Sequence, residues 1–130
     1  MSETKQAQGH FIVQLEPQKD TNNPLLGRLL IQKQLHGQLE ATSYGQMLSA
    51  GTNTQGSACY VAIEYITGSL DGRLGSFSLH HTGIMNRGES QLSLGIVPDS
   101  GTEELIGICG TMTLGQHQGQ KTYLLEYSFA

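Results

Sequence analysis

Two side chains near the middle of the chain, Glu64 and His81, are the residues best suited to acid–base chemistry. Between them lies Asp71-Gly72, a pair typical of a two-residue hairpin turn because both positions tolerate a positive φ. This turn would place Ala62 opposite His81, with Glu64 as the diagonal neighbour of His81 on the same face. Diagonal pairs lie about 7–8 Å apart, within reach of long side chains. A carboxylate and an imidazole are therefore predicted to meet.

The same register places five candidate ligand-binding residues on one face of the predicted hairpin. They are Tyr60, Glu64, Arg73, Phe77 and His81. If this face points into the protein, it could anchor the polar group of a small ligand. It could also transfer protons, with pKa values set by burial, or form a satisfied structural cluster, or face solvent. The sequence leaves these four interpretations open.

Alternation of apolar and polar residues runs through almost the whole chain, which is typical of β-strands. Eight strands are expected, over residues 9–16, 26–35, 38–48, 57–70, 73–82, 90–97, 104–114 and 121–129. The connections are too short for a crossover helix, so neighbouring strands are expected to be antiparallel. We therefore predict an all-β fold, a closed eight-stranded antiparallel up-and-down (meander) barrel, because closure removes the unpaired edges.

Length and charge limit the classes of protein. The 130 residues are expected to form a single domain, with residues 1–8 as a flexible N-terminal segment. The net charge of -4 and only seven Lys and Arg residues argue against nucleic-acid binding, which needs clustered positive charge. No apolar run approaches the roughly 20 residues that span a bilayer, and no signal peptide is visible. We expect a cytoplasmic protein without a nucleic-acid or membrane partner.

The sequence predicts neither a metal site nor a cofactor. Cys59 and Cys109 lack a CxxC or CxxH spacing, which predicts two reduced thiols. His80 and His81 are adjacent in a strand, so their side chains point to opposite faces and cannot share a metal ion. No nucleophile elbow, zinc-protease, P-loop or dinucleotide motif is found. The identity of any catalytic residue therefore stays unknown.

Six segments carry a resemblance to a known bacterial family. They are Gly37-Gln38-Leu39-Glu40-Ala41-Thr42-Ser43, Tyr60-Val61-Ala62-Ile63-Glu64, Gly72-Arg73-Leu74-Gly75-Ser76-Phe77, Val97-Pro98-Asp99-Ser100-Gly101-Thr102, Glu104-Leu105-Ile106-Gly107 and Tyr123-Leu124-Leu125-Glu126-Tyr127. They resemble the single-domain family catalogued as domain of unknown function 3224, over nearly the whole chain. The resemblance implies a barrel similar to that of allene oxide cyclase. It implies no activity, because a shared fold does not transfer chemistry.

Two functional hypotheses follow. In the first, the barrel is not an enzyme, and it binds a small, largely apolar molecule in or at its mouth or acts as a homo-oligomer, a dimer or trimer. Self-assembly is expected because apolar residues occupy outer positions whichever face lies inside. In the second, the protein is a cofactor-independent isomerase or cyclase, with Glu64 and His81 as acid and base and Tyr60 assisting. An open cavity that both Glu64 and His81 reach would favour the enzyme.

Overall fold

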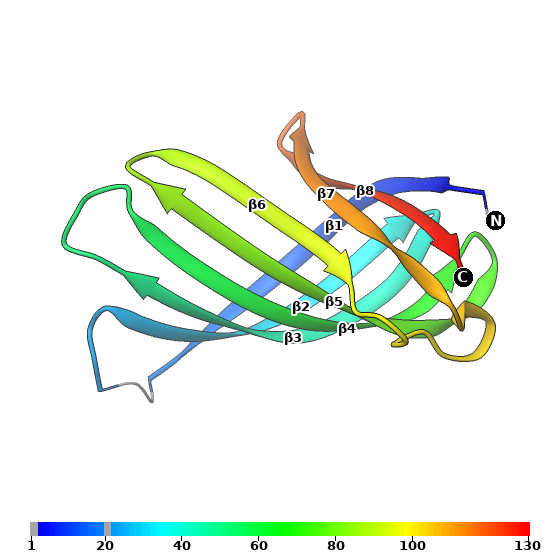
Figure 1. Ribbon diagram of the computed structural model, residues 1–130, viewed down its shortest axis with the longest axis horizontal. Coiled ribbons are helices and arrows are strands. Elements are labelled where there is room, and N and C mark those ends of the chain that lie inside the picture. Colours follow the sequence, from blue (N-terminus) through cyan, green and yellow to red (C-terminus); the bar gives the residue numbers. More distant parts are fainter. Residues whose placement is uncertain (1–2, 20–21) are drawn as a thin grey trace.

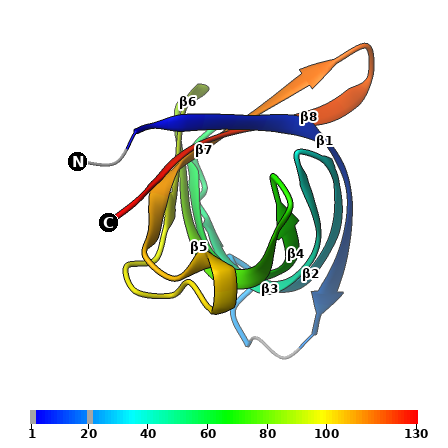
Figure 2. The ribbon, with the colours of Figure 1, turned by 90° about the vertical axis from the view of Figure 1, so that its right-hand side faces the viewer.

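The computed structural model describes residues 3–19 and 22–130, which form a closed antiparallel β-barrel (Figure 1). Eight strands of the described residues pair in chain order, and β8 pairs with β1. They are β1 (Lys5–Gln18), β2 (Leu26–Gly37), β3 (Leu39–Gly51), β4 (Ala58–Leu70), β5 (Arg73–Asn86), β6 (Glu89–Ile96), β7 (Ile108–His117) and β8 (Gln120–Phe129). Figure 2 shows the strands curving around a common axis. The predicted meander barrel is confirmed, while the likeness to allene oxide cyclase stays a prediction.

Two-residue turns set the register of three hairpins. Leu70 pairs with Arg73 across Asp71-Gly72, whose φ angles of 49° and 85° are those of the predicted type I′ turn. The pairs Arg87-Gly88 and Gln118-Gly119 take the same left-handed conformation. Because this turn twists in the same sense as the strands beside it, it fixes which residues face each other across each hairpin.

Alternate residues along each strand point into the barrel and form its core. The buried apolar side chains that pack together are Ala7, Phe11, Leu35, Leu39, Ala41, Ile66, Leu70, Phe77, Leu79, Leu94, Ile96, Leu105, Ile108, Met112, Tyr123, Leu125 and Tyr127. Glu64 and His81 are buried among the inward-facing residues, at 0% and 5% exposure. The interpretation in which their face points to solvent is therefore wrong.

One end of the barrel is closed by the segment between β6 and β7. Pro98 follows β6 and cannot donate a ladder hydrogen bond, so the strand stops there. The 3-10 turn η1 (Glu103–Leu105) then inserts Leu105 into this end, where its side chain is 1% exposed. A Cβ atom at Gly75 would lie 3.1 Å from Cγ of Leu105 and 2.3 Å from the carbonyl oxygen of Thr102. The close approach of η1 therefore requires glycine at this position.

The other end carries the connections β1–β2, β3–β4 and β5–β6, on the left of Figure 1. No apolar side chain comparable to Leu105 closes this end among the described residues: Met85 and Leu92 are 44% and 46% exposed there. The barrel therefore has one closed end and one open mouth.

Two strands begin more than one residue away from their predicted starts. β1 begins at Lys5, because Lys5–Gln8 pair with β8 instead of forming the expected flexible segment over residues 1–8. Residues 1 and 2 of that segment lie outside the described residues. β7 begins at Ile108 instead of residue 104, because Glu103 takes a left-handed φ of 54° and starts η1.

Cys59 and Cys109 are free thiols, as predicted. Within residues 3–19 and 22–130, no helix has the length and apolar character needed to cross a membrane.

Candidate functional site

Four polar side chains meet inside the barrel, with Glu64 of β4 at their centre. Oε1 of Glu64 accepts a hydrogen bond from Oγ of Ser43 at 2.6 Å. Oε2 accepts a hydrogen bond from Nζ of Lys33 at 2.9 Å and lies against Nε2 of His81. This contact brings the imidazole against the carboxylate, but Nε2 has no hydrogen-bond partner of regular geometry among the described residues. We call Lys33, Ser43, Glu64 and His81 the buried cluster.

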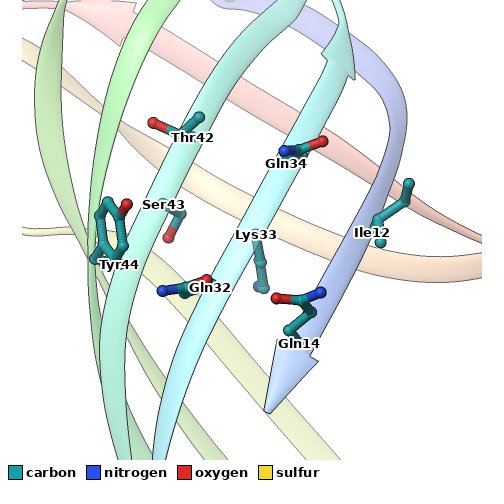
Figure 3. A pocket seen from close by; sticks show the side chains of 8 residues that line it. All are labelled: Ile12, Gln14, Gln32, Lys33, Gln34, Thr42, Ser43 and Tyr44. Atoms are coloured by element: carbon teal, nitrogen blue, oxygen red, sulfur yellow. The ribbon is translucent and has the colours of Figure 1, made fainter. Parts of the chain in front are cut away.

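Pairing of the strands positions the members of this cluster. Lys33 of β2 pairs with Ser43 of β3, and both point inward, side by side (Figure 3). Gly45 of β3 lies opposite Glu64. A Cβ atom at Gly45 would lie 2.1 Å from the carbonyl oxygen of Ile63 and 3.0 Å from Cγ of Glu64. The absence of a side chain at Gly45 therefore leaves the space that the Glu64 side chain needs.

Opposing effects decide the pKa of Glu64. Burial raises this pKa, because it removes the charged form from water. The hydrogen bond with His81, the charge of Lys33 and the hydrogen bond from Ser43 act in the opposite direction and lower it to about 2. Glu64 is therefore ionised at neutral pH, and Lys33 supplies the compensating charge. Nζ of Lys33 also lies 4.9 Å from the centroid of the Phe11 ring, a cation–π contact.

The structure brings three of the five sequence-predicted residues together. Ala62 pairs with His81, as the turn at Asp71-Gly72 predicts, and Glu64 contacts His81. The ring of Tyr60 meets that of His81 edge-on, with their centroids 6.4 Å apart. Glu64, His81 and Tyr60 therefore form one connected group.

The other two predicted residues lie elsewhere. Phe77 is fully buried in the core, nearer the closed end, where it pairs with Ile66. Arg73 begins β5 beside the turn and is exposed, with its guanidinium carbon 4.5 Å from the centroid of the Phe129 ring. Along a strand, the separation of eight positions between Arg73 and His81 corresponds to roughly 27 Å, so the two cannot contact one ligand group.

Sequence reasoning missed Lys33 and Ser43. A signal for Lys33 was present, because Leu29, Ile31 and Leu35 alternate with it and place it on an otherwise apolar strand face. The lysine on that face could have been read as the partner of a buried acid. Ser43 carried no comparable signal, because serine is common in strands that have one exposed face.

A hollow opens at the mouth of the barrel, above the buried cluster. Its volume is about 460 Å³, within the range of about 300–1,000 Å³ for small-molecule sites. It is lined by Leu29, Met47, Ser49, Ala50, Gly51, Ala58, Cys59, Tyr60, Gly83, Ile84, Met85, Ser90, Gln91 and Leu92. None of these described residues carries a formal charge. We call this hollow the mouth pocket. Tyr60 lines it, whereas Glu64 and His81 do not.

A smaller hollow lies against β1, β2 and β3 (Figure 3). Its volume is about 180 Å³, and it is lined by Ile12, Gln14, Gln32, Lys33, Gln34, Thr42, Ser43 and Tyr44. Apart from Lys33 and Ser43, these side chains are exposed on the outer face of the barrel. It is smaller than typical ligand pockets, and the mouth pocket is the better candidate.

Comparison with known proteins places the chain in a family. The family model described as "Protein of unknown function (DUF3224)" matches residues 7–127. The chain belongs to this family. A solved structure of a protein with unknown function from the DUF3224 family of Shewanella oneidensis MR-1 is 44% identical. The match covers 98% of each chain, with a TM-score of 0.92. No curated protein matches the chain. The resemblance carried by the six segments is confirmed.

Glu64 of this DUF3224 barrel is enclosed by its partners, which limits its access to a ligand. A general base must reach the proton that it abstracts, directly or through one water molecule. Both carboxylate oxygens of Glu64 already contact groups of the chain, and the side chain is fully buried. Within the described residues, no group of three or more His, Cys, Asp or Glu side chains could hold a metal ion.

Proposed function

We propose that this DUF3224 barrel binds a small, largely apolar molecule in the mouth pocket. The observation that carries this proposal is the pocket itself, about 460 Å³ in volume and with an uncharged wall. Its lining includes the large apolar side chains of Leu29, Met47, Ile84, Met85 and Leu92. Burial of apolar ligand surface against such walls contributes about 25 cal/mol per Å². Met side chains adapt to ligands of irregular shape, which suits a pocket without charged contacts.

In this proposal the buried cluster has a structural role. It fills the interior beneath the pocket with mutually satisfied polar groups and holds His81 against Tyr60. The alternative, a cofactor-independent isomerase or cyclase with Glu64 and His81 as acid and base, has less support. It requires both side chains to reach a ligand, and of the three groups named for it only Tyr60 lines the pocket.

Native mass spectrometry of freshly purified protein tests the binding proposal. We expect a bound small molecule that dissociates on unfolding. Ala58→Phe should reduce its occupancy, because Ala58 is exposed at the pocket wall and a phenyl ring there would fill the space. Ser93→Phe is the matched control, since Ser93 is also exposed but does not line the pocket. Two outcomes would refute the proposal. Added apolar ligands could bind equally well to Ala58→Phe and Ser93→Phe, or they could bind to neither variant and not to the wild type.

Self-assembly as a homo-oligomer, a dimer or trimer, is a second candidate, favoured by the outer face of β3 and β4. Tyr44, Leu48, Val61, Ile63 and Tyr65 are 45–64% exposed there, and we call them the outer apolar patch. Leu48 pairs with Val61 and Tyr44 with Tyr65, so the patch is continuous across the two strands. Exposed patches of this kind usually mark interaction sites. None of the five patch residues is charged, and Arg28 of β2, which pairs with Leu48, donates a hydrogen bond to Gln46 between Tyr44 and Leu48.

A further inference from the structure

Tyr60 is the one residue with an aromatic hydroxyl among the described residues that line the mouth pocket. This hydroxyl donates no hydrogen bond to any described residue, in contrast to the hydroxyls of Tyr123 and Tyr127. The residue is only half-buried, so the phenol can meet a ligand. A donor without a protein partner at the wall of a pocket is the kind of group that orients ligands.

The position of the Tyr60 ring is fixed from two sides. On one side it lies over Gly83, where a Cβ atom would come within 2.1 Å of Cε1 of the ring. On the other side it meets His81 edge-on, and His81 is in turn held by Glu64. Any larger residue at position 83 would displace the ring. The buried cluster thus positions the phenol before a ligand arrives, which lowers the ordering cost of binding.

The uncharged lining around the phenol disfavours a ligand with an ionised group. None of the described residues that line the mouth pocket is charged. Lys33 and His81, the basic residues of the buried cluster, both contact Glu64. Burial and the charge of Glu64 raise the pKa of Tyr60, so the phenol keeps its proton at neutral pH and acts as a donor. An ionised ligand group would be buried here without a counter-charge, which is costly.

We infer that the Tyr60 hydroxyl donates a hydrogen bond to the carbonyl oxygen of an uncharged, otherwise apolar ligand. The inference rests on the proposed function and adds the chemical class of the ligand. A carbonyl oxygen is a strong uncharged hydrogen-bond acceptor. The apolar remainder of the ligand would pack against Met47, Met85 and Leu92 on the pocket wall. Glu64 and His81 act here as positioning residues.

Isothermal titration calorimetry with three probes of similar size tests this inference on the full chain. The probes are 2-octanone, 2-methyloct-1-ene, in which a methylene group replaces the carbonyl oxygen, and octanoate, which is charged. We expect the ketone to bind about two- to tenfold more tightly than the alkene, the value of one net hydrogen bond. Octanoate should bind more weakly than the ketone. Tyr60→Phe should abolish the preference for the ketone. Tyr44→Phe is the matched control and should keep the preference, since Tyr44 is exposed on the outer face and does not line the mouth pocket.

Infrared spectroscopy of the bound ketone gives a second readout. If Tyr60 had a purely structural role, the frequency of the ligand's carbonyl band would not depend on the Tyr60 hydroxyl. The carbonyl band of the ketone should shift to lower frequency in the wild type and in Tyr44→Phe, but not in Tyr60→Phe. Equal affinity of the ketone and the alkene, or tighter binding of octanoate, would overturn the inference and leave the proposed function standing. Failure of all three probes to bind, in the wild type as in Ala58→Phe, would overturn both.

Discussion

Lys33 and Glu64, 31 positions apart in the sequence, form an ion pair inside the barrel, with Nζ 2.9 Å from Oε2. The two side chains are 8% and 0% exposed. Removing two charges from water is costly, and their attraction offsets that cost only when further hydrogen bonds satisfy the remaining groups. Ser43 and His81 supply these contacts here. The pair therefore depends on the whole buried cluster.

The first prediction concerns the coupling between Lys33 and Glu64. Glu64→Leu alone should lower the free energy of unfolding by about 3–5 kcal/mol, because it leaves Lys33 buried without a counter-charge. The double variant Lys33→Met/Glu64→Leu should recover part of this loss, because it removes both charges of the ion pair together. Urea unfolding should give a coupling energy of at least about 0.5 kcal/mol. Lys121→Met is the control, because Lys121 is exposed and should not couple with Glu64. Additive effects for Lys33 and Glu64 would contradict the prediction.

The second prediction is a pH dependence of stability. The pKa of Glu64 lies at about 2 in the folded protein, below its ordinary value of 4.5. The unfolded chain therefore binds the proton more readily, and the stability from Glu64 is fully present above about pH 4.5 and lost as the pH falls toward 2. Urea unfolding of the wild type and of Glu64→Gln should show a difference in stability that shrinks over this window. A difference that stays constant from pH 6 to pH 2.5 would be evidence against it.

The third prediction concerns the glycine that makes room for Glu64. Gly45→Ala should destabilise the protein by about 1–3 kcal/mol, because its Cβ would lie 2.1 Å from a backbone oxygen that cannot move away freely. Gly51→Ala is the matched control on the same strand, where the nearest atom would be 3.8 Å away. Its effect should stay within about 0.5 kcal/mol. Thermal or urea unfolding measures both, and equal effects would show that position 45 tolerates a side chain.

The fourth prediction is self-association through the outer apolar patch. Light scattering should give a mass that is a multiple of 14.1 kDa. Ile63→Lys should shift this mass toward that of the monomer, because it places a charge in the patch. Ile106→Lys, a change at a residue that is 70% exposed and outside the patch, should leave the mass unchanged. A wild-type mass near 14.1 kDa at high concentration would rule out assembly.

Local sequence information determined the strands and one register of this protein. Alternating apolar residues predicted an all-β chain, because successive strand side chains point to opposite faces. Asp71-Gly72 set the pairing of β4 with β5, because a two-residue turn allows only one register. These two facts were sufficient to place Glu64 beside His81, since both residues belong to the same hairpin.

Only the tertiary structure decided which other residues join them. Lys33 and Ser43 reach Glu64 because β2, β3 and β4 curve around one axis. No two-residue turn beside the cluster sets the register between these strands, so the sequence did not reveal this contact. Arg73 shares the predicted strand face but lies outside the core, because it is next to the turn. Leu105 closes one end of the barrel, because Pro98 stops β6 and the following segment folds back over that end. The opposite end has no such segment among the described residues and stays open. Such long-range packing depends on closure of the whole sheet, which no local pattern encodes.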